Sequence, residues 1–342
     1  MTRNLRYDIA TWQVHETESD CNLIIRSNSG HVFYCYICPG QFIRSPSVVS
    51  QYFKCLQLLR SGEVEIDDFY EDDAFEWLFG CFEPLITNLA SSSDVVVEPT
   101  LADYFFPKQT FGCNLTAMDD KTKPQELDTK NHSWSSPIVK FDADFLENLN
   151  TWTECYTPSQ VKICYAGIEE SLIKPPKRTT VTGKDGEPIT CFFKKFGLSF
   201  GPSHARKELI TLKKIIEAQI PPPPKAYICR LIGVVREGDG LLGMLFTWIP
   251  SKAVLSKVRA TASPSELRKR WASQIQNSVD ILHEKGIVWG DAKADNVILD
   301  QNDDAWVIDF GGGYTAGWVD EYKAGTLEGD RQGLAKILDM LL

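Results

Sequence analysis

The sequence predicts an α+β protein in which an acidic N-terminal domain precedes a region of strands and then a mainly helical region. Residues 1–150 carry a formal net charge of −12, whereas the remaining residues carry +2. Near residue 157, short strand-like runs separated by acidic turns give way to longer, regularly spaced elements. The 342 residues suffice for about two or three domains. We therefore predict a separate packed domain over residues 1–156.

The composition excludes several classes of protein. Hydrophobic residues make up 43% and charged residues 24% of the chain, as in ordinary globular proteins. The longest apolar run, residues 241–249, is much shorter than the roughly 20 residues of a membrane-spanning helix. The N-terminus lacks the apolar segment of a secretory signal, so we expect a cytoplasmic or nuclear protein without a membrane partner. Basic residues form no cluster, so no nucleic-acid partner is expected.

The acidic N-terminal domain carries no recognisable chemical motif. We predict strands over residues 22–26, 32–38 and 94–97, helices over 47–59 and 73–89, and a long exposed loop over 117–137. Its charge indicates either a solvated face or a surface that attracts a basic partner. The ten cysteines of the chain are expected to be reduced and structural, because Cys35 and Cys38, the only closely spaced pair, lie in a strand-like run.

The region from residue 157 begins with five strands and one helix. Periodicity predicts strands over 161–165, 179–182, 189–196, 227–235 and 241–249, with a helix over 203–219 after the third strand. A second helix is predicted to begin at Ser263, because Pro264 and Glu266 complete the pattern of a capping box. An apolar stripe follows these residues, and Gly286 is placed to end the helix.

Four polar residues follow this helix at fixed spacings. Asp291, Lys293 and Asn296 lie within one short loop, and Asp309 lies thirteen residues beyond Asn296, followed by phenylalanine and glycine. Apolar runs border both groups. The pattern resembles the protein-kinase superfamily, whose catalytic loop H-R-D-x-K-x-x-N is followed by D-F-G. Chance does not readily place all of these residue types at these intervals.

The resemblance implies a phosphotransferase that uses ATP and Mg²⁺. Asn296 and Asp309 would supply oxygen ligands for magnesium on the nucleotide phosphates. Asp291 would accept the proton of the attacking hydroxyl, which belongs to a protein or a small molecule. Lys293 would stabilise charge on the phosphoryl group during transfer.

Upstream residues extend the resemblance. The family's strand lysine, which holds the phosphates and pairs with a helix glutamate, would be Lys194, with Glu208 as its partner. Lys195 is the competing choice. We favour Lys194 because it shares a strand face with Phe192, whereas Phe193 points to the other face.

The implied fold has two lobes, a kinase-like N-lobe over residues 157–250 and a minimal C-lobe over residues 251–342 that ends in the family's central helix. Backbone groups of Thr247 and Ile249, at the end of the last predicted strand, would bond the adenine edge. Asp330, at the start of the central helix, would hold the backbone of the catalytic loop.

The sequence also departs from the family pattern. Trp289 and Gly290 replace the histidine and arginine of the catalytic loop. The glycine-rich phosphate loop is missing near residues 166–170, which carry two acidic side chains and one glycine. Phe192 replaces a small alanine and could stack on adenine or fill its pocket. The segment from Asp309 to the central helix is short.

These departures leave three functions open. The W-G-D-x-K-x-x-N loop looks like that of a group of fungal protein-kinase-like proteins. Family resemblance favours a protein serine/threonine kinase. The short segment after Asp309 favours a small-molecule kinase of the aminoglycoside or choline type. Phe192 and the missing glycine loop favour a pseudokinase that acts as a binding or scaffold module.

Overall fold

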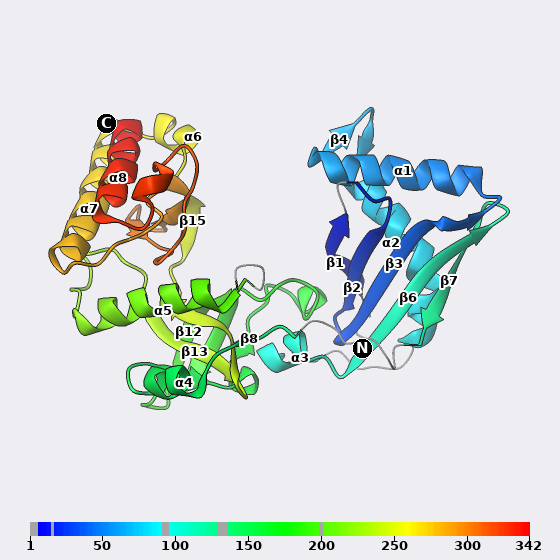
Figure 1. Cartoon of the computed structure of the whole chain (residues 1–342), viewed down its shortest axis with the longest axis horizontal. Helices are drawn as coiled ribbons and strands as arrows, with labels where there is room; N and C mark the ends of the chain where they lie inside the picture. Colours follow the sequence, from blue (N-terminus) through cyan, green and yellow to red (C-terminus); the bar gives the residue numbers. More distant parts are fainter. Residues whose placement is uncertain (1–5, 15–16, 91–95, 129–135, 198–200) are drawn as a thin grey trace. The chain divides into compact units, whose positions relative to one another are not determined.

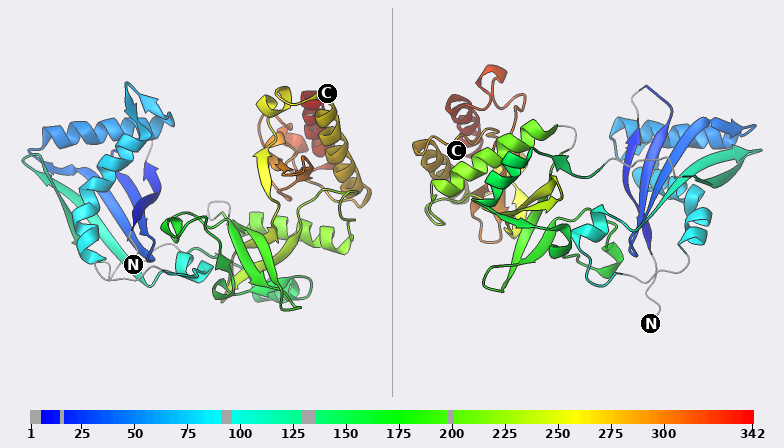
Figure 2. Two further views of the ribbon diagram at one scale, coloured as in Figure 1. Left: turned by 180° about the vertical axis from the view of Figure 1, so that it is seen from behind. Right: turned by 60° about the horizontal axis from the view of Figure 1, so that its bottom comes forward.

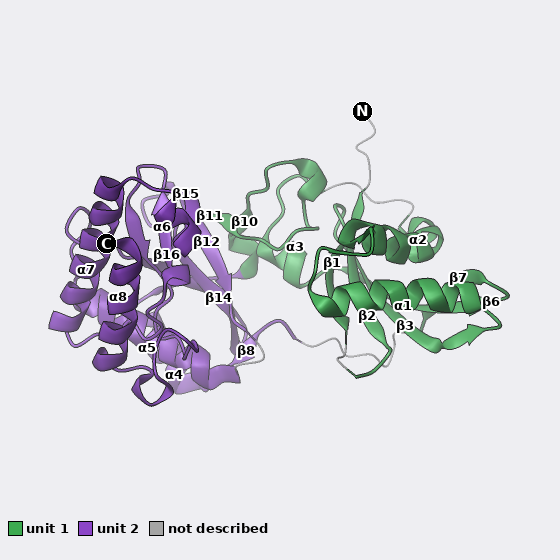
Figure 3. Ribbon diagram, turned by 90° about the horizontal axis from the view of Figure 1, so that it is seen from above, with its two compact units in different colours: residues 1–135, 158–182 green, residues 136–157, 183–342 purple. Residues whose placement is uncertain are grey.

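The chain forms two compact units. A computed structural model describes residues 6–14, 17–90, 96–128, 136–197 and 201–342. The N-terminal unit comprises residues 1–135 and 158–182, and the C-terminal unit comprises residues 136–157 and 183–342; Figure 3 shows them in green and purple. The division between compact units therefore does not fall between residues 156 and 157, where the sequence suggested a domain boundary.

The N-terminal unit is built on a five-stranded sheet with the order β1-β2-β3-β6-β7 (Figure 1). The strands are β1 (Tyr7–Val14), β2 (Cys21–Ser27), β3 (His31–Ile43), β6 (Gln109–Met118) and β7 (Lys121–Leu127). Within this described sheet β3 and β6 pair in parallel, and the other neighbouring strands pair antiparallel. Their connection contains α1 (Pro46–Ser61), the short strands β4 (Glu65–Ile66) and β5 (Phe69–Tyr70), α2 (Glu71–Leu89) and α3 (Leu101–Phe105).

One face of this sheet packs against α1 and α2. Because side chains alternate between the two faces of a strand, β2 turns Leu23 and Ile25 into the core. They join Tyr52 and Leu56 of α1 and Leu78 of α2 in one hydrophobic cluster. The two predicted helices and the first two predicted strands of this region are confirmed.

The predicted exposed loop over residues 117–137 is wrong. β6 runs into it, and β7 follows as the edge strand of the sheet. Asp119 and Asp120 join the two strands with φ angles of 52° and 59°, which are typical of a type I′ turn. An exposed edge strand that contains Pro124 has no alternating apolar pattern, so its sequence resembles a loop. Residues 129–135 lie outside the described residues.

The N-terminal unit also contains β10 (Lys162–Ile163) and β11 (Arg178–Thr182), which pair antiparallel. Between them, Ile168–Glu170 form a 3-10 turn at the place where a glycine-rich loop is missing. Of the strand predicted over residues 94–97, the first two residues lie outside the described part of the chain. Val96 and Val97 belong to no strand, so the described half of that prediction is wrong.

The C-terminal unit begins with a sheet in which β12, β14 and β13 pair antiparallel and β9 runs parallel beside β13. Its strands are β8 (Val139–Lys140), β9 (Glu154–Tyr156), β12 (Pro188–Lys195), β13 (Leu231–Glu237) and β14 (Gly240–Thr247). Two helices, α4 (Ala143–Asn150) and α5 (Gly201–Glu217), accompany them. Leu146 and Leu149 of α4 share a hydrophobic cluster with Leu209 and Leu212 of α5. This packing is why residues 136–157 belong to the C-terminal unit.

The rest of the C-terminal unit is mainly helical. It contains α6 (Lys257–Thr261), α7 (Ser265–Glu284) and α8 (Leu327–Leu341), with a small antiparallel sheet of β15 (Ser251–Val254), β16 (Val297–Asp300) and β17 (Ala305–Val307). Figure 2 shows α7 and α8, coloured gold and red, packed side by side. Mixed α and β structure is thus present in both units.

The two ends of α7 differ in how well the sequence predicts them. The expected capping box is wrong, because Pro264 is the N-cap and the Ser263 hydroxyl instead donates to the carbonyl of Arg259 at 2.8 Å. Gly286 ends the helix as expected, with a φ of 67°. Its N–H bonds the His283 carbonyl, and the next N–H bonds the Leu282 carbonyl, which is the Schellman arrangement.

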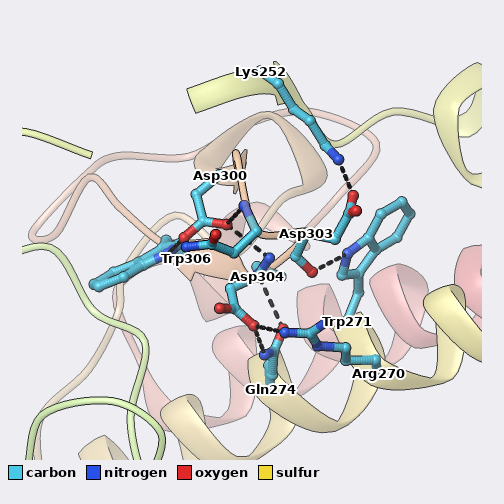
Figure 4. Close-up of polar contacts among 10 residues, drawn as sticks. Lys252, Arg270, Trp271, Gln274, Asp300, Asp303, Asp304 and Trp306 are labelled. Atoms are coloured by element: carbon cyan, nitrogen blue, oxygen red, sulfur yellow. Dashed lines mark hydrogen bonds and ion pairs between the residues drawn. The ribbon is translucent and has the colours of Figure 1, made fainter. Parts of the chain in front are cut away.

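The turn between β16 and β17 is tied to α7 by polar contacts (Figure 4). Asp300 accepts bonds from the N–H groups of Asn302 and Asp304 and from the indole of Trp306. The Trp271 indole of α7 donates to the Asp303 carbonyl at 3.0 Å. These contacts fix the hairpin whose two ends carry Asn296 and Asp309.

Two further sequence expectations concern cysteines and membranes. All ten cysteines are free thiols. Burial raises the pKa of the Cys35 thiol, which favours its protonated, inert form. In the described part of the chain, no helix combines the length and apolar character needed to cross a bilayer.

Candidate active site

Lys194 bridges two carboxylates from different elements. Its Nζ lies 2.6 Å from Glu208 Oε1 on α5 and 2.6 Å from Asp309 Oδ1 beyond β17. The strand alternation explains the choice between neighbouring lysines. Phe193 is buried in the core, so Lys194 must point to the opposite face together with the half-exposed Phe192.

The charges of this triad depend on one another. Burial lowers the pKa of Lys194, but the carboxylates of Glu208 and Asp309 raise it by more, so the net shift is upward. Burial raises the pKa of Glu208, and the neighbouring ammonium only partly offsets that effect. With both carboxylates ionised, the triad carries one net negative charge. This excess favours a further cation at Asp309, whose side chain is 39% exposed.

The hairpin of β16 and β17 brings Asn296 and Asp309 close together. Asn296 directly precedes β16 and Asp309 lies two residues beyond the end of β17, and the two strands pair through Val297 and Val307. The Ile308 N–H donates to the Asn296 carbonyl at 3.0 Å. The Asn296 side-chain nitrogen donates to Asp291, so its amide oxygen is the atom suited to a metal. Both candidate ligands therefore offer hard oxygen donors, as Mg²⁺ requires.

A second polar cluster surrounds Asp291. Lys293 Nζ lies 2.7 Å from Asp291 Oδ2 and donates to Thr315 Oγ1 at 2.9 Å. The Thr315 hydroxyl donates to Asp291 Oδ1 at 2.8 Å, and Asn296 Nδ2 donates to Asp291 Oδ2 at 3.0 Å. Asp291 is thus oriented by three side chains, in the manner expected of a group that must align a hydroxyl.

Thr315 is a residue that sequence reasoning missed. It lies in an irregular segment without periodicity, six residues beyond Asp309, and no motif assigns a role to that position. The only available signal was that Thr315 stands two residues after a run of three glycines. Two contacts help to hold this segment: Lys336 donates to the Gly317 carbonyl at 2.8 Å, and the Asp320 N–H donates to Gln332 at 3.0 Å.

Asp330 bonds the backbone of Trp289 and Gly290, directly before Asp291, which is the arrangement that the resemblance implies. Its carboxylate accepts from the N–H groups of Trp289 at 2.6 Å and Gly290 at 2.8 Å, and it contacts His283 Nε2 at 2.9 Å. Burial raises the pKa of Asp330, and these three contacts counteract part of that increase. Trp289 is fully buried, and its indole donates to the Ile308 carbonyl at 2.9 Å.

Glycines allow the close approach of three backbone segments at this site. Gly290 has a φ of 98°, a conformation that other residues rarely adopt. A Cβ on Gly311 would lie 2.7 Å from Glu208 Cα, and one on Gly312 would lie 2.7 Å from Asp291 Cβ. The glycines at 290, 311 and 312 therefore let the segment after Asp309 contact both α5 and the loop that carries Asp291.

The predicted adenine-binding residues lie at the end of β14. Thr247 is the last residue of the strand, and its N–H donates to the Arg230 carbonyl at 2.9 Å. Because the Thr247 N–H is already bonded, the backbone group of Thr247 that could bond an adenine is its carbonyl, which would act as an acceptor. Ile249, two residues further on, and Phe246, directly before Thr247, both have buried side chains.

The comparisons with known proteins agree with this geometry. Residues 203–325 match the family model of the protein kinase domain, a stretch that contains Glu208, Asp291, Lys293, Asn296 and Asp309. Lys194 lies upstream of the matched stretch. A search of the curated proteins found no match to the chain. The C-terminal part of the chain therefore carries a protein kinase domain over residues 203–325, and an α+β region precedes it.

Proposed function

We propose that this chain is an ATP- and magnesium-dependent phosphotransferase that phosphorylates a hydroxyl of a protein serine or threonine. The observation that carries the proposal is the presence of two polar clusters, Lys194–Glu208–Asp309 and Asp291–Lys293–Thr315, with Asn296 beside Asp291. Phosphoryl transfer depends mainly on alignment and charge neutralisation, and these clusters supply both.

Each residue has a distinct task in this proposal. Magnesium, when bound, neutralises phosphate charge, and Asp309 and Asn296 would hold it through their oxygens. Lys194 would bind nucleotide phosphates while Glu208 keeps its ammonium group in place. Asp291 would orient the acceptor hydroxyl and take its proton, and Lys293 would stabilise negative charge on the transferred group.

Adenine recognition is proposed at the end of β14. The Thr247 carbonyl would accept from the exocyclic amine, and the Ile249 N–H would donate to the ring. Phe192, with 37% of its surface exposed on the face of Lys194, would stack on the base. The group that accepts the phosphate is also part of the proposal. Lys293, two residues after Asp291, favours a protein hydroxyl by family resemblance.

A second candidate function is that of a pseudokinase binding module. One reason is Phe192, whose ring would occupy part of the adenine pocket if it does not stack on the base. The other is the 3-10 turn at Ile168–Glu170, which stands in place of a glycine-rich loop. The acidic N-terminal unit would then serve the binding role, with a basic protein as its partner.

Phosphoryl transfer from radiolabelled ATP to a generic basic protein tests the proposal. Wild-type protein should transfer phosphate only with magnesium. Asp291→Ala should lower the rate by about 10²–10⁴-fold while ATP binding stays nearly unchanged, because a general base acts on the hydroxyl. Asp295→Asn is the matched control, since Asp295 is an exposed carboxylate in the same loop. ATP binding without any turnover would instead support the pseudokinase.

A further inference from the structure

A pocket of about 480 Å³ lies beside the phosphotransfer residues but is lined by none of them. Its walls come from the outward side of α5, the turn at residues 286–290, the glycine run at 311–313 with Tyr314, and residues 324–325. Lys194, Asp291, Lys293 and Asp309 do not contribute to it. The size is within the usual range of small-molecule pockets.

The charge of this pocket is opposite to that of the chain. Lys207 and Lys214 line it, and no lining residue is a carboxylate, whereas the chain as a whole carries −10. Within the described residues neither lysine takes part in an ion pair. Seven residues of helix place the Cα atoms of Lys207 and Lys214 about 10.5 Å apart along one face of α5, a separation that two long lysine side chains can close around one anion. Two unpaired ammonium groups at one concave site attract an anion.

The other walls indicate what the anion is attached to. Ile210 is 44% exposed and Tyr314 is 45% exposed, and both face this pocket. Thr211 also lines the pocket, and its hydroxyl already donates to the Lys207 carbonyl at 3.1 Å. The pocket thus combines cationic groups with apolar and aromatic surface and offers no carboxylate to bind a cation. Lysine is a common point-charge partner of phosphate.

We propose that this pocket binds a small aromatic phosphomonoester, with the phosphate at Lys207 and Lys214 and the aromatic group against Ile210 and Tyr314. The site is separate from the proposed ATP site and does not need magnesium. Because its walls join α5, which carries Glu208, to the segment after Asp309, an occupied pocket holds these elements together. Occupancy would therefore strengthen ATP binding, a consequence that rests on the proposed function.

Calorimetric titration of the whole chain, without ATP or magnesium, tests the site with three probes. Phenyl phosphate carries both features, inorganic phosphate carries only the charge, and phenol carries only the ring. We expect phenyl phosphate to bind at least tenfold more tightly than either of the others. Its affinity should fall as salt is raised, since the contacts with the lysines are exposed.

Variants of α5 make the test specific. The double variant Lys207→Met/Lys214→Met should weaken phenyl phosphate binding at least tenfold. Lys213→Met is the matched control, because Lys213 lies on the same helix, pairs with Glu217 and does not line the pocket. If the double variant melts at a lower temperature than wild type, Lys214→Glu replaces it in the comparison.

The outcomes separate this site from the proposed function. Asp309→Asn should leave phenyl phosphate binding intact even if it abolishes ATP binding. The proposal is overturned if wild type does not bind phenyl phosphate at millimolar concentration, or if binding persists unchanged in the double variant.

Discussion

The two units differ in where they keep their charged groups. The region 1–150 is the more acidic part of the sequence, yet every carboxylate that is buried among the described residues lies in the C-terminal unit: Glu208, Asp291, Asp300 and Asp330. The buried polar side chains of the N-terminal unit are neutral or imidazole groups, such as Asn28 and His31. Net charge along the sequence is thus a poor guide to where chemistry is located.

The difference has a physical explanation. A buried carboxylate is costly unless it is paired or hydrogen-bonded, so a fold retains it where its contacts are needed. Asp291, Asp300 and Asp330 each accept at least two hydrogen bonds, and Glu208 pairs with the ammonium group of Lys194. In the N-terminal unit, carboxylates such as Asp119 and Asp120 act at the surface, where they pair with Arg44 and cap α1. We expect such groups to affect stability weakly and activity not at all.

Removing one carboxylate from each unit gives the largest expected contrast in stability. Asp330→Ala would leave the N–H groups of Trp289 and Gly290 buried without an acceptor, at a cost of about 2–4 kcal/mol. Asp120→Ala removes the exposed cap of α1 and should cost about 1 kcal/mol. Urea unfolding of both variants measures the difference. Equal losses would contradict the comparison.

Replacing Thr315 tests whether the contacts of Asp291 matter for catalysis. Thr315→Ala removes hydrogen bonds to a carboxylate and an ammonium group, each worth about 1.5–3 kcal/mol, so turnover should fall about 10–100-fold with the KM for ATP unchanged. Thr315→Ser keeps the hydroxyl and should restore most of the rate. Steady-state kinetics provide the readout. A serine variant as slow as the alanine variant would show that the methyl group, not the hydroxyl, is important.

The smallest effect concerns alkaline pH. The upward pKa shift of Lys194 means that its stabilising contribution is fully present below about pH 10.4 and is lost as the pH rises through the folded-state pKa. The stability difference between wild type and Lys194→Met should therefore shrink above about pH 10.4, by about 1 kcal/mol or less.

An exposed pair in the N-terminal unit serves as the control for this experiment. Lys174 and Glu170 are joined at 2.6 Å on the surface, and this hydrogen bond also raises the pKa of Lys174. Because solvent screens an exposed pair, Lys174→Met should show no resolvable alkaline step. Melting temperatures measured from pH 8 upward compare the two lysines. A step of the same size for both would mean that burial of Lys194 is irrelevant.

The positions of Lys194 and Glu208 could be predicted because each lies within a regular element. Strand alternation sets the side of Lys194, and helix periodicity sets the side of Glu208. The two strands of the β16–β17 hairpin are joined by a short turn, so the residues at their open ends can likewise be predicted to lie close together. These local rules account for the contact between Lys194 and Glu208, while the roles of the two residues stay a prediction.

Features that depend on long-range packing could not be predicted from the sequence. Thr315 reaches Asp291 from an irregular segment, and no local rule predicts that contact. β7 is stabilised by pairing with β6 rather than by its own pattern, so it resembled a loop. The segment 136–157 joins the C-terminal unit because α4 packs on α5, residues that are more than fifty positions apart in the chain.

The most direct test of the account is the stabilisation of the protein by ATP, with and without magnesium. At a hundredfold excess over Kd, ligand binding adds about 2.7 kcal/mol, which raises the melting temperature of a chain of this size by a few degrees. We predict this increase only when magnesium is present, its loss in Asp309→Asn, and its retention in Glu83→Gln, an exposed carboxylate of the N-terminal unit. No increase in wild type, or an equal increase in Asp309→Asn, would contradict the placement of the nucleotide site in the C-terminal unit.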